Sequence, residues 1–423
     1  MLIHLLNATV MTMPEYQRRL VDSVLDELLA ALPAVLLVGP RASGKTTTAL
    51  QRARTVLRLD RNEVGGAVAN DPDGVLADSD PPILIDEWQI VPAVLGAVKR
   101  SVDTSSTAAR FILTGSSRAD LQADGWPATG RVVRVPVWPM NMRERVGRVG
   151  LRSLVDRMFD NDFAELVVRE PPNLRDYIEI ALQSGFPEIT TQPNSRVVKR
   201  WLESYVDQVI LRDAPFAGQD RDPQRLRAYL TAIAASSAEV VNHKTLYDAA
   251  GVSRSAAMAY DSLLELLYVT ERVPAYSTNR LSQLNRSPKR YIIEPALIGA
   301  LLRVDGRTVI RDARLVGGLI DSFVTAQLRS ELFASESSPS MTHLRQADGR
   351  HEVDLVLEGP AGRIVGIEIK ASSAPTAAMI KHLVWLRNEL GDQFATGVIF
   401  HTGPRPFRMD DRIWALPIHT LWT

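Results

Sequence analysis

The stretch Ala34–Leu50, AVLLVGPRASGKTTTAL, decides the fold of the amino-terminal part of this chain. Its apolar beginning predicts a buried strand, and the residues after Lys45 are compatible with a helix. Between them lies a segment with the spacing of a P-loop: Gly39, Pro40, Arg41, Ala42, Ser43, Gly44, Lys45, Thr46 and the adjacent Thr47. A strand, this loop and a helix in that order predict an α/β core with a parallel sheet and a nucleotide site at its edge.

The chemistry of a P-loop gives these residues separate roles. Glycines allow backbone N–H groups to close around phosphates, and the helix amino terminus adds positive potential. Lys45 would reach the β and γ oxygens, and Thr46 would offer a hydroxyl to Mg²⁺. The sequence therefore predicts ATP and Mg²⁺ as cofactors.

Two later apolar strands end in polar residues that suit the same site. In PPILIDEWQ, residues 81–89, Asp86 would hold Mg²⁺ through water and Glu87 would polarise the attacking water. In RFILTGSS, the strand ends at Thr114, which suits a sensor of the γ-phosphate. This set favours hydrolysis over phosphorylation of a small molecule.

Together these motifs, and a Gly130-Arg131 pair before a last strand, resemble the AAA+-type ATPases of prokaryotes that carry a carboxyl-terminal domain of unknown function. SGFPEI, WLESYVDQVILRD, RSPKRYIIEPAL, HEVDLVLE, GIEIK and LPIHTLW extend the resemblance along nearly the whole chain. The resemblance implies that Arg131 acts as an arginine finger on a neighbouring subunit, and hence a homo-oligomer. Arg118 is the rival finger, and a surface arginine that caps a strand is the other interpretation of Arg131.

Periodicity beyond the core predicts further units. We expect the ATPase core at residues 1–145, a helical lid at 146–215, a winged helix-turn-helix at 216–305 and an α/β nuclease-like domain at 306–423. In residues 240–269, the turn at Gly251 and a helix cap at Ser253 favour the winged helix. Its predicted small core is Leu246, Ala249, Val252, Met258 and Leu263, and its predicted presented face includes Lys244, Arg254, Ser255, Ala256 and Tyr260.

Eight basic residues oppose four acidic ones between Glu271 and Asp312. Such a local excess could meet the phosphates of DNA. Winged helices also serve as plain protein contacts, so DNA remains one of two interpretations of this unit.

The segment HEVDLVLEGPAGRIVGIEIK, residues 351–370, predicts a hairpin with charges on one face. Pairing centred on Ala361 sets Asp354 opposite Glu368 and Glu352 opposite Lys370, and facing carboxylates repel unless a cation lies between them. An aspartate followed by Glu-x-Lys is the signature of PD-(D/E)xK nucleases, in which carboxylates bind Mg²⁺ or Mn²⁺ and the lysine orients water. The predicted helix 317–332 carries Asp321, where related proteins often carry glutamate. The alternative is a face neutralised by Lys370.

Composition bounds the remaining choices. Forty-nine basic residues balance forty-nine acidic ones, so no overall field attracts nucleic acid or membrane. No cysteine is present and the seven histidines are scattered, which argues against thiolate metal sites and disulfides. The apolar residues 1–13 lack a basic start and a small-residue cleavage site, which predicts a cytoplasmic protein without a membrane segment. Three functions stay open: an ATPase that acts on a partner such as DNA, an ATP-regulated nuclease, and an ATP-binding scaffold or switch for another protein.

Overall fold

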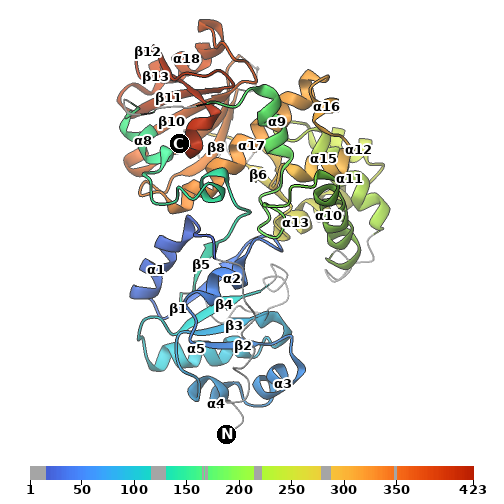
Figure 1. The fold of residues 1–423 in the computed structure, drawn as a ribbon, viewed down its shortest axis with the longest axis vertical. Coiled ribbons are helices and arrows are strands. Elements are labelled where there is room, and N and C mark those ends of the chain that lie inside the picture. The colour runs from blue at the N-terminus through green and yellow to red at the C-terminus, as the bar shows by residue number, and fades with distance from the viewer. Residues whose placement is uncertain are drawn as a thin grey trace.

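The computed structural model describes residues 16–115, 130–163, 166, 170–213, 222–277, 287–346 and 350–423. The amino-terminal stretch 1–13 and Arg118 lie outside the described residues. Figure 1 shows the amino-terminal core at one end of the molecule, with the carboxyl-terminal sheet and the winged helix side by side at the other.

The amino-terminal core is a five-stranded sheet of the order β2-β3-β4-β1-β5, in which every pair is parallel. The strands are β1 (Ala34–Val38), β2 (Thr55–Arg58), β3 (Ile83–Asp86), β4 (Phe111–Thr114) and β5 (Val133–Pro136). Their helices are α1 (Val21–Ala31), α2 (Lys45–Leu50), α3 (Asn62–Asn70), α4 (Pro72–Ala77) and α5 (Val94–Thr104). The predicted parallel α/β core is therefore confirmed.

Alternation along the strands decides which helices cover which face. Leu36 and Leu113 pack towards α3, α4 and α5, whereas Leu37 and Ile112 pack towards α1 and α2. Successive side chains of a strand point to opposite faces, so a strand covered on both sides reads as a continuous apolar run. This is why AVLLV and FILT contain almost no polar residue.

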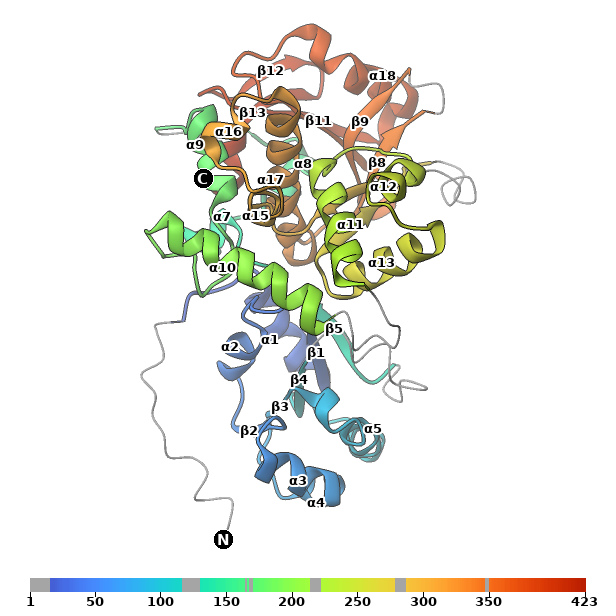
Figure 2. The same cartoon turned by 90° about the vertical axis from the view of Figure 1, so that its right-hand side faces the viewer.

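A helical segment connects the core to the rest of the chain. It comprises α7 (Met142–Arg145), α8 (Leu154–Asp160), α9 (Leu174–Leu182), α10 (Ser195–Gln208), a π-helical turn at Val209–Asp213 and α11 (Pro223–Ala235). Within the range predicted as a lid, α8 packs against the carboxyl-terminal sheet at β10 and β11. Figure 2 shows α10 crossing the view between the amino-terminal core and the winged helix. The limits of the four predicted domains stay predictions.

The next elements have the order of a winged helix-turn-helix. They are α12 (His243–Ala249), α13 (Arg254–Leu266) and the antiparallel pair β6 (Thr270–Val273) and β7 (Lys289–Ile292), followed by α15 (Ala296–Leu302) and α16 (Gly306–Val309). As predicted, Ser253 caps α13, with its hydroxyl accepting from the Ala256 N–H at 3.2 Å.

Two residues of the predicted small core are not buried, so the prediction is wrong for them. Met258 is 55% exposed and Ala249 is exposed as well. Once Ser253 sets the start of α13, Ala257, Tyr260 and Leu264 fall on the buried side, and Met258 lies about 100° away from Ala257. Tyr260, predicted on the presented face, is thus buried instead.

The carboxyl-terminal sheet has the order β12-β13-β11-β10-β9-β8. Its elements are α17 (Ala313–Ala334), β8 (Ser340–Arg345), β9 (Glu352–Glu358), β10 (Ile364–Ile369), α18 (Lys381–Leu390), β11 (Phe394–His401), β12 (Phe407–Asp410) and β13 (Ile413–Pro417). Helix α17 packs on one face and α18 on the other. Strands β9 and β10 pair Glu358 with Ile364 and Leu355 with Ile367, which confirms the hairpin register centred on Ala361.

Helix α17 contacts every large part of the molecule. It packs against α1 of the amino-terminal core, against α8 and α9, and against β10 of the carboxyl-terminal sheet. Its 22 residues make it long enough to do so, at about 1.5 Å per residue. Among the residues that the structure describes, no helix has the length and apolar character needed to span a membrane.

Candidate functional site

The P-loop is built around two glycines that no other residue could replace without strain. Gly39 has φ +141°, and a Cβ there would lie 2.2 Å from the Val137 carbonyl oxygen. Gly44 has φ +93° and begins α2 directly before Lys45. Only glycine adopts such backbone angles readily, so the strand turns sharply into the helix.

The side chain of Lys45 is folded onto its own loop. Its ammonium donates to the carbonyls of Gly39 at 3.0 Å and Pro40 at 2.7 Å. Burial lowers the pKa of Lys45 to about 8, and the nearby Glu87 opposes that shift. The ammonium therefore lies at the loop, where phosphate oxygens could replace the two carbonyls as its partners. The neighbouring residues Arg41, Ala42 and Thr47 are exposed.

The carboxylate of Asp86 binds two of the other predicted site residues. Its Oδ1 accepts from the Thr46 hydroxyl at 2.8 Å and from the Thr114 hydroxyl at 2.5 Å. Glu87 follows at the strand end with φ +55° and accepts a hydrogen bond from Gln89. The structure thus brings Lys45, Thr46, Asp86, Glu87 and Thr114 together, although they come from three strand ends.

Arg131 precedes β5 and therefore lies at the amino-terminal ends of the strands, whereas the P-loop lies at their carboxyl-terminal ends. Val133 pairs with Val35, whereas the P-loop follows Val38, so Arg131 lies about 20 Å from the loop at about 3.3 Å per residue. Its Nε is 2.9 Å from the Asp103 carboxylate, and both side chains are partly exposed. Arg131 is therefore outside the nucleotide site of its own chain.

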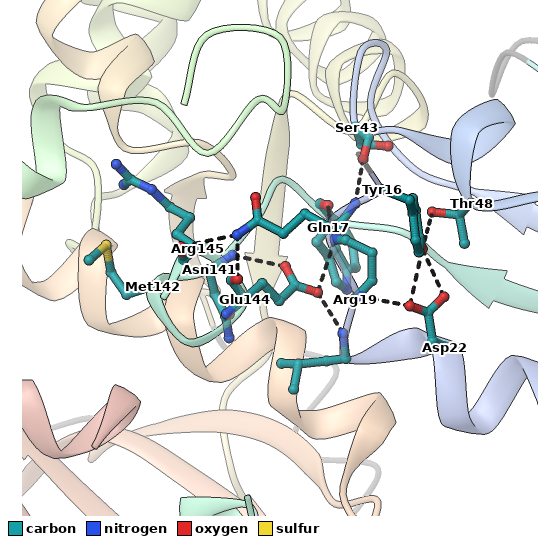
Figure 3. Close-up of polar contacts among 12 residues, drawn as sticks. Tyr16, Gln17, Arg19, Asp22, Ser43, Thr48, Asn141, Met142, Glu144 and Arg145 are labelled. Carbon is teal, nitrogen blue, oxygen red and sulfur yellow. Dashed lines mark hydrogen bonds and ion pairs between the residues drawn. The ribbon is translucent and has the colours of Figure 1, made fainter. Parts of the chain in front are cut away.

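A buried arginine, Arg19, lies behind the P-loop and was not predicted. Arg19 donates to the carbonyl oxygens of Ser43 at 2.9 Å and Trp138 at 2.6 Å, and it pairs with Glu144 at 3.0 Å. Figure 3 shows this arrangement, with Tyr16 and Asp22 beside it. An isolated arginine before a helix matches no motif, so only its burial identifies it.

The carboxyl-terminal hairpin does gather charges, though not all four of those predicted. Lys370 lies 3.1 Å from Asp354 and 2.6 Å from Glu368, which confirms that Lys370 neutralises this face. Asp354 also accepts from the Ile369 N–H at 2.9 Å. Glu352 is not part of this group, because its side chain is 45% exposed and lies 3.9 Å from Arg345 on the neighbouring strand.

A second lysine enters this cluster from the winged helix. Lys289 on β7 reaches Asp321 at 2.7 Å and Asp354 at 3.3 Å, and Tyr291 donates to Asp321 at 3.1 Å. The prediction missed Lys289, although a lysine inside an apolar strand needs a buried partner and is a usable signal. We call Lys289, Asp321, Asp354, Glu368 and Lys370 the buried charge cluster.

The buried charge cluster does not fit the predicted second Mg²⁺ or Mn²⁺ site. The ammonium of Lys289 already pairs with the carboxylates of Asp321 and Asp354, which would have to hold the metal. Over the described ranges, no group of three or more histidine, aspartate or glutamate side chains could hold a metal ion. Two lysines therefore supply the positive charge here.

The ionisation of the cluster follows from burial and from these lysines. Burial would raise the pKa of Asp354, but Lys289 and Lys370 hold it well below its usual range. Burial raises the pKa of Asp321 to about 6 against the pull of Lys289. Burial, with Asp354 nearby, raises the pKa of Glu368 to about 8. Glu368 therefore keeps its proton to a higher pH than an exposed glutamate does.

Stability should fall as pH rises through the pKa of Glu368. The folded protein binds this proton more tightly than the unfolded chain, so the contribution is complete below the ordinary pKa near 4.5 and is lost towards pH 8. Between pH 5.5 and 8.5, the thermal midpoint of the wild type should drop by roughly a few degrees more than that of Glu368→Gln. Asp321 and Glu294, whose pKa values burial raises to about 6 and about 7, are present in both proteins, so the difference between them reports on Glu368. Equal drops would contradict the assignment.

Some of the basic side chains that make up the excess around the winged helix are buried. Lys289 and Arg290 are buried, and Arg290 pairs with Asp261 at 3.0 Å. Lys244 pairs with Asp248 at 2.5 Å on the surface. The charge count along the sequence therefore overestimated the number of basic side chains that this unit has available for phosphates. Arg254 is exposed, at the start of α13.

Comparison with known proteins agrees with this geometry. Residues 32–146 match the family described as AAA domain, and residues 174–308 and 316–421 match two domains of unknown function, DUF8612 and DUF4143. The parallel sheet and the P-loop over residues 32–146 are thus those of a P-loop ATPase core of the AAA type. More particularly, this core is followed in the chain by residues 316–421, which match DUF4143, a domain of unknown function.

The relatives cover most of the chain. Uncharacterized proteins of Mycobacterium bovis and Mycobacterium tuberculosis are each 27% identical over 413 residues, which is 96% of this chain and 85% of the relative. Among solved structures, a Walker-type ATPase of Pyrococcus abyssi has 16% identity and a TM-score of 0.41, covering 67% of this chain and 95% of its own. A protein from Vibrio cholerae has 12% identity and a TM-score of 0.21, covering 92% and 95%.

Proposed function

We propose that this chain hydrolyses ATP with Mg²⁺ and uses its nucleotide state to act on DNA held by its carboxyl-terminal half. The observation that carries the first part is the meeting of Thr46 and Thr114 on the carboxylate of Asp86, beside Lys45 and Glu87. Such a set at one sheet edge suits an attacking water and a γ-phosphate.

Each of these residues would act on the phosphates or on water. Lys45 would leave the loop carbonyls and pair with the β and γ oxygens. The Thr46 hydroxyl and the Asp86 carboxylate are hard oxygen donors that fit Mg²⁺, which neutralises phosphate charge when bound. Glu87 would orient and polarise the attacking water, and Thr114 would contact the γ-phosphate.

The DNA partner is proposed from the winged-helix elements and the exposed start of α13 with Arg254 and Ser255. Such contacts would be made to phosphates, so we expect binding that is weak in sequence preference and sensitive to salt. We do not propose DNA cleavage, because Lys289 pairs with the carboxylates that would have to hold the metal. Action on another protein is the competing outcome.

ATP turnover measured with and without double-stranded DNA tests the proposal. We expect Mg²⁺-dependent turnover that changes in rate when DNA is added, and DNA that stays intact with Mg²⁺ or Mn²⁺. Absence of turnover in both conditions would reject the ATPase assignment. Turnover unaffected by DNA, without DNA binding at low salt, would leave a protein partner instead.

Arg131 is proposed to serve the nucleotide site of a neighbouring subunit in a homo-oligomer. Arg131→Ala should then keep ATP binding and lower turnover at least tenfold, because a finger stabilises charge in the transition state. Mixing Arg131→Ala with Lys45→Ala subunits should restore part of the activity. In a preparation shown to contain mixed oligomers, no recovery would argue against an intersubunit site.

A further inference from the structure

The guanidinium of Arg19 holds the P-loop from behind. It is 5% exposed and donates to the Ser43 carbonyl oxygen at 2.9 Å, while a Cβ on Gly44 would lie only 3.2 Å from its Nη1. A P-loop directs its N–H groups at the phosphates, so a carbonyl tied down on the far side fixes the orientation of those groups. Arg19 therefore acts on the peptide between Ser43 and Gly44.

The same arginine is tied to α7 through Glu144. Arg19 lies 3.0 Å from Glu144 Oε1, which also accepts from the Leu20 N–H at 2.8 Å. The second oxygen of Glu144 accepts from the Asn141 N–H at 3.1 Å, and Asn141 accepts in return from the Glu144 N–H at 2.9 Å. Figure 3 shows these bonds as one continuous set. A continuous set of contacts thus runs from the P-loop to α7.

From α7 the contacts continue into α17. The Met142 N–H donates to Gln327 Oε1 at 2.6 Å, and Arg143 pairs with Glu331 at 2.7 Å with both side chains at most 5% exposed. Hydrogen bonds in such a buried setting are stronger than in water and costly to leave unmade. Helix α17 also carries Asp321, so it reaches the buried charge cluster.

We propose that Arg19 is a positioning residue for the P-loop, and that Arg19 and Glu144 couple nucleotide occupancy to the packing of α17. This coupling rests on the proposed nucleotide binding, and it would connect the nucleotide site to the carboxyl-terminal half of the chain. Coupling between two sites is reciprocal, so a change at α17 must also reach the P-loop when no nucleotide is present.

The first experiment uses this reciprocity and needs no ATP. Amide hydrogen exchange of residues 39–48 is compared in the full chain for Gln327→Ala and for the matched control Arg314→Ala. Arg314 lies on the same helix, but its ion pair with Glu239 is at the surface. We expect exchange of the P-loop amides to be at least twofold faster in Gln327→Ala and unchanged in Arg314→Ala. Equal exchange in the two variants would overturn the link.

The second experiment adds a fluorescent ATP analogue with Mg²⁺. In the wild type we expect binding to change the amide exchange of residues 323–334. Glu144→Gln keeps the size of the side chain but weakens its pairing with Arg19, so it should bind the analogue while losing most of that change. A change of the same size in Glu144→Gln would reject the coupling. If the wild type fails to bind the analogue, the proposed function fails, and the first experiment still decides the link.

Binding by Arg19 variants separates positioning from general stability. Arg19→Lys keeps the charge but cannot reach three acceptors with one planar group, so we expect the dissociation constant to rise several-fold. Arg19→Ala should raise it at least tenfold if it folds. An unchanged dissociation constant in Arg19→Lys, with P-loop exchange also unchanged, would show that Arg19 does not position the loop.

Discussion

Replacing Glu87 by glutamine is expected to leave ATP binding intact and to lower turnover by about 10²–10⁴-fold, the range over which a positioned general base contributes. Glutamine fills the same space but cannot take up or polarise a proton in the same way. Glu87 lies close enough to Lys45 to affect its pKa, which places it beside the P-loop lysine. Single-turnover hydrolysis and equilibrium binding of ATP, measured on the same preparation, check both halves of the expectation.

Lys45→Ala provides the matched contrast. It removes the ammonium that the loop carbonyls hold at 2.7 and 3.0 Å, so we expect loss of binding as well as loss of turnover. Two variants that both lost turnover but differed in binding would separate the two roles. Wild-type turnover in Glu87→Gln would show that another residue activates the water.

Lys289→Met is expected to cost about 3–5 kcal/mol of unfolding free energy, because it leaves the carboxylates of Asp321 and Asp354 buried without their shared cation. Both the lysine and the two acids have side chains less than a fifth exposed. Water therefore cannot replace the lost partner at low cost. Chemical denaturation followed by fluorescence would measure the loss.

Two controls sharpen this expectation. Arg314→Ala removes an ion pair whose arginine is 66% exposed, and should change stability by no more than about 1 kcal/mol. Adding Asp321→Asn to Lys289→Met removes one stranded charge, so the double variant should lose less than the sum of the two single losses. A Lys289→Met protein as stable as the Arg314→Ala protein would mean that the cluster is not held by this lysine.

Much of the nucleotide site could be predicted because its residues follow strands in a fixed order. Thr46, Asp86 and Thr114 each stand at a strand or helix end that the apolar pattern marks, and parallel strands bring those ends to one edge. The hairpin register was predictable for a similar reason, since the loop around Ala361 is short and the pattern of side chains has a period of two.

The parts that escaped prediction depend on contacts between distant segments. Lys289 and Asp354 are 65 residues apart and belong to different sheets, so nothing local in either strand pairs them. Arg19 and Glu144 are separated by still more of the chain. The burial of Met258 was mispredicted for a different reason. The apolar pattern of α13 allows either of two neighbouring faces of the helix to be the buried one, and only the tertiary contacts select between them.

The packing of α17 against α1 has a consequence for synthesis of the chain. Phe333, near the end of α17, contacts the apolar cluster formed by α1, β1 and α2. The last strand of the amino-terminal core ends at Pro136 and is synthesised about 200 residues before Phe333, a delay of about 10–40 s at roughly 5–20 residues per second. During that interval α1 lacks the cover that α17 gives it in the complete protein. A core grafted onto another carboxyl-terminal half would meet the same difficulty permanently, so the two ends of this protein are expected to be inherited together.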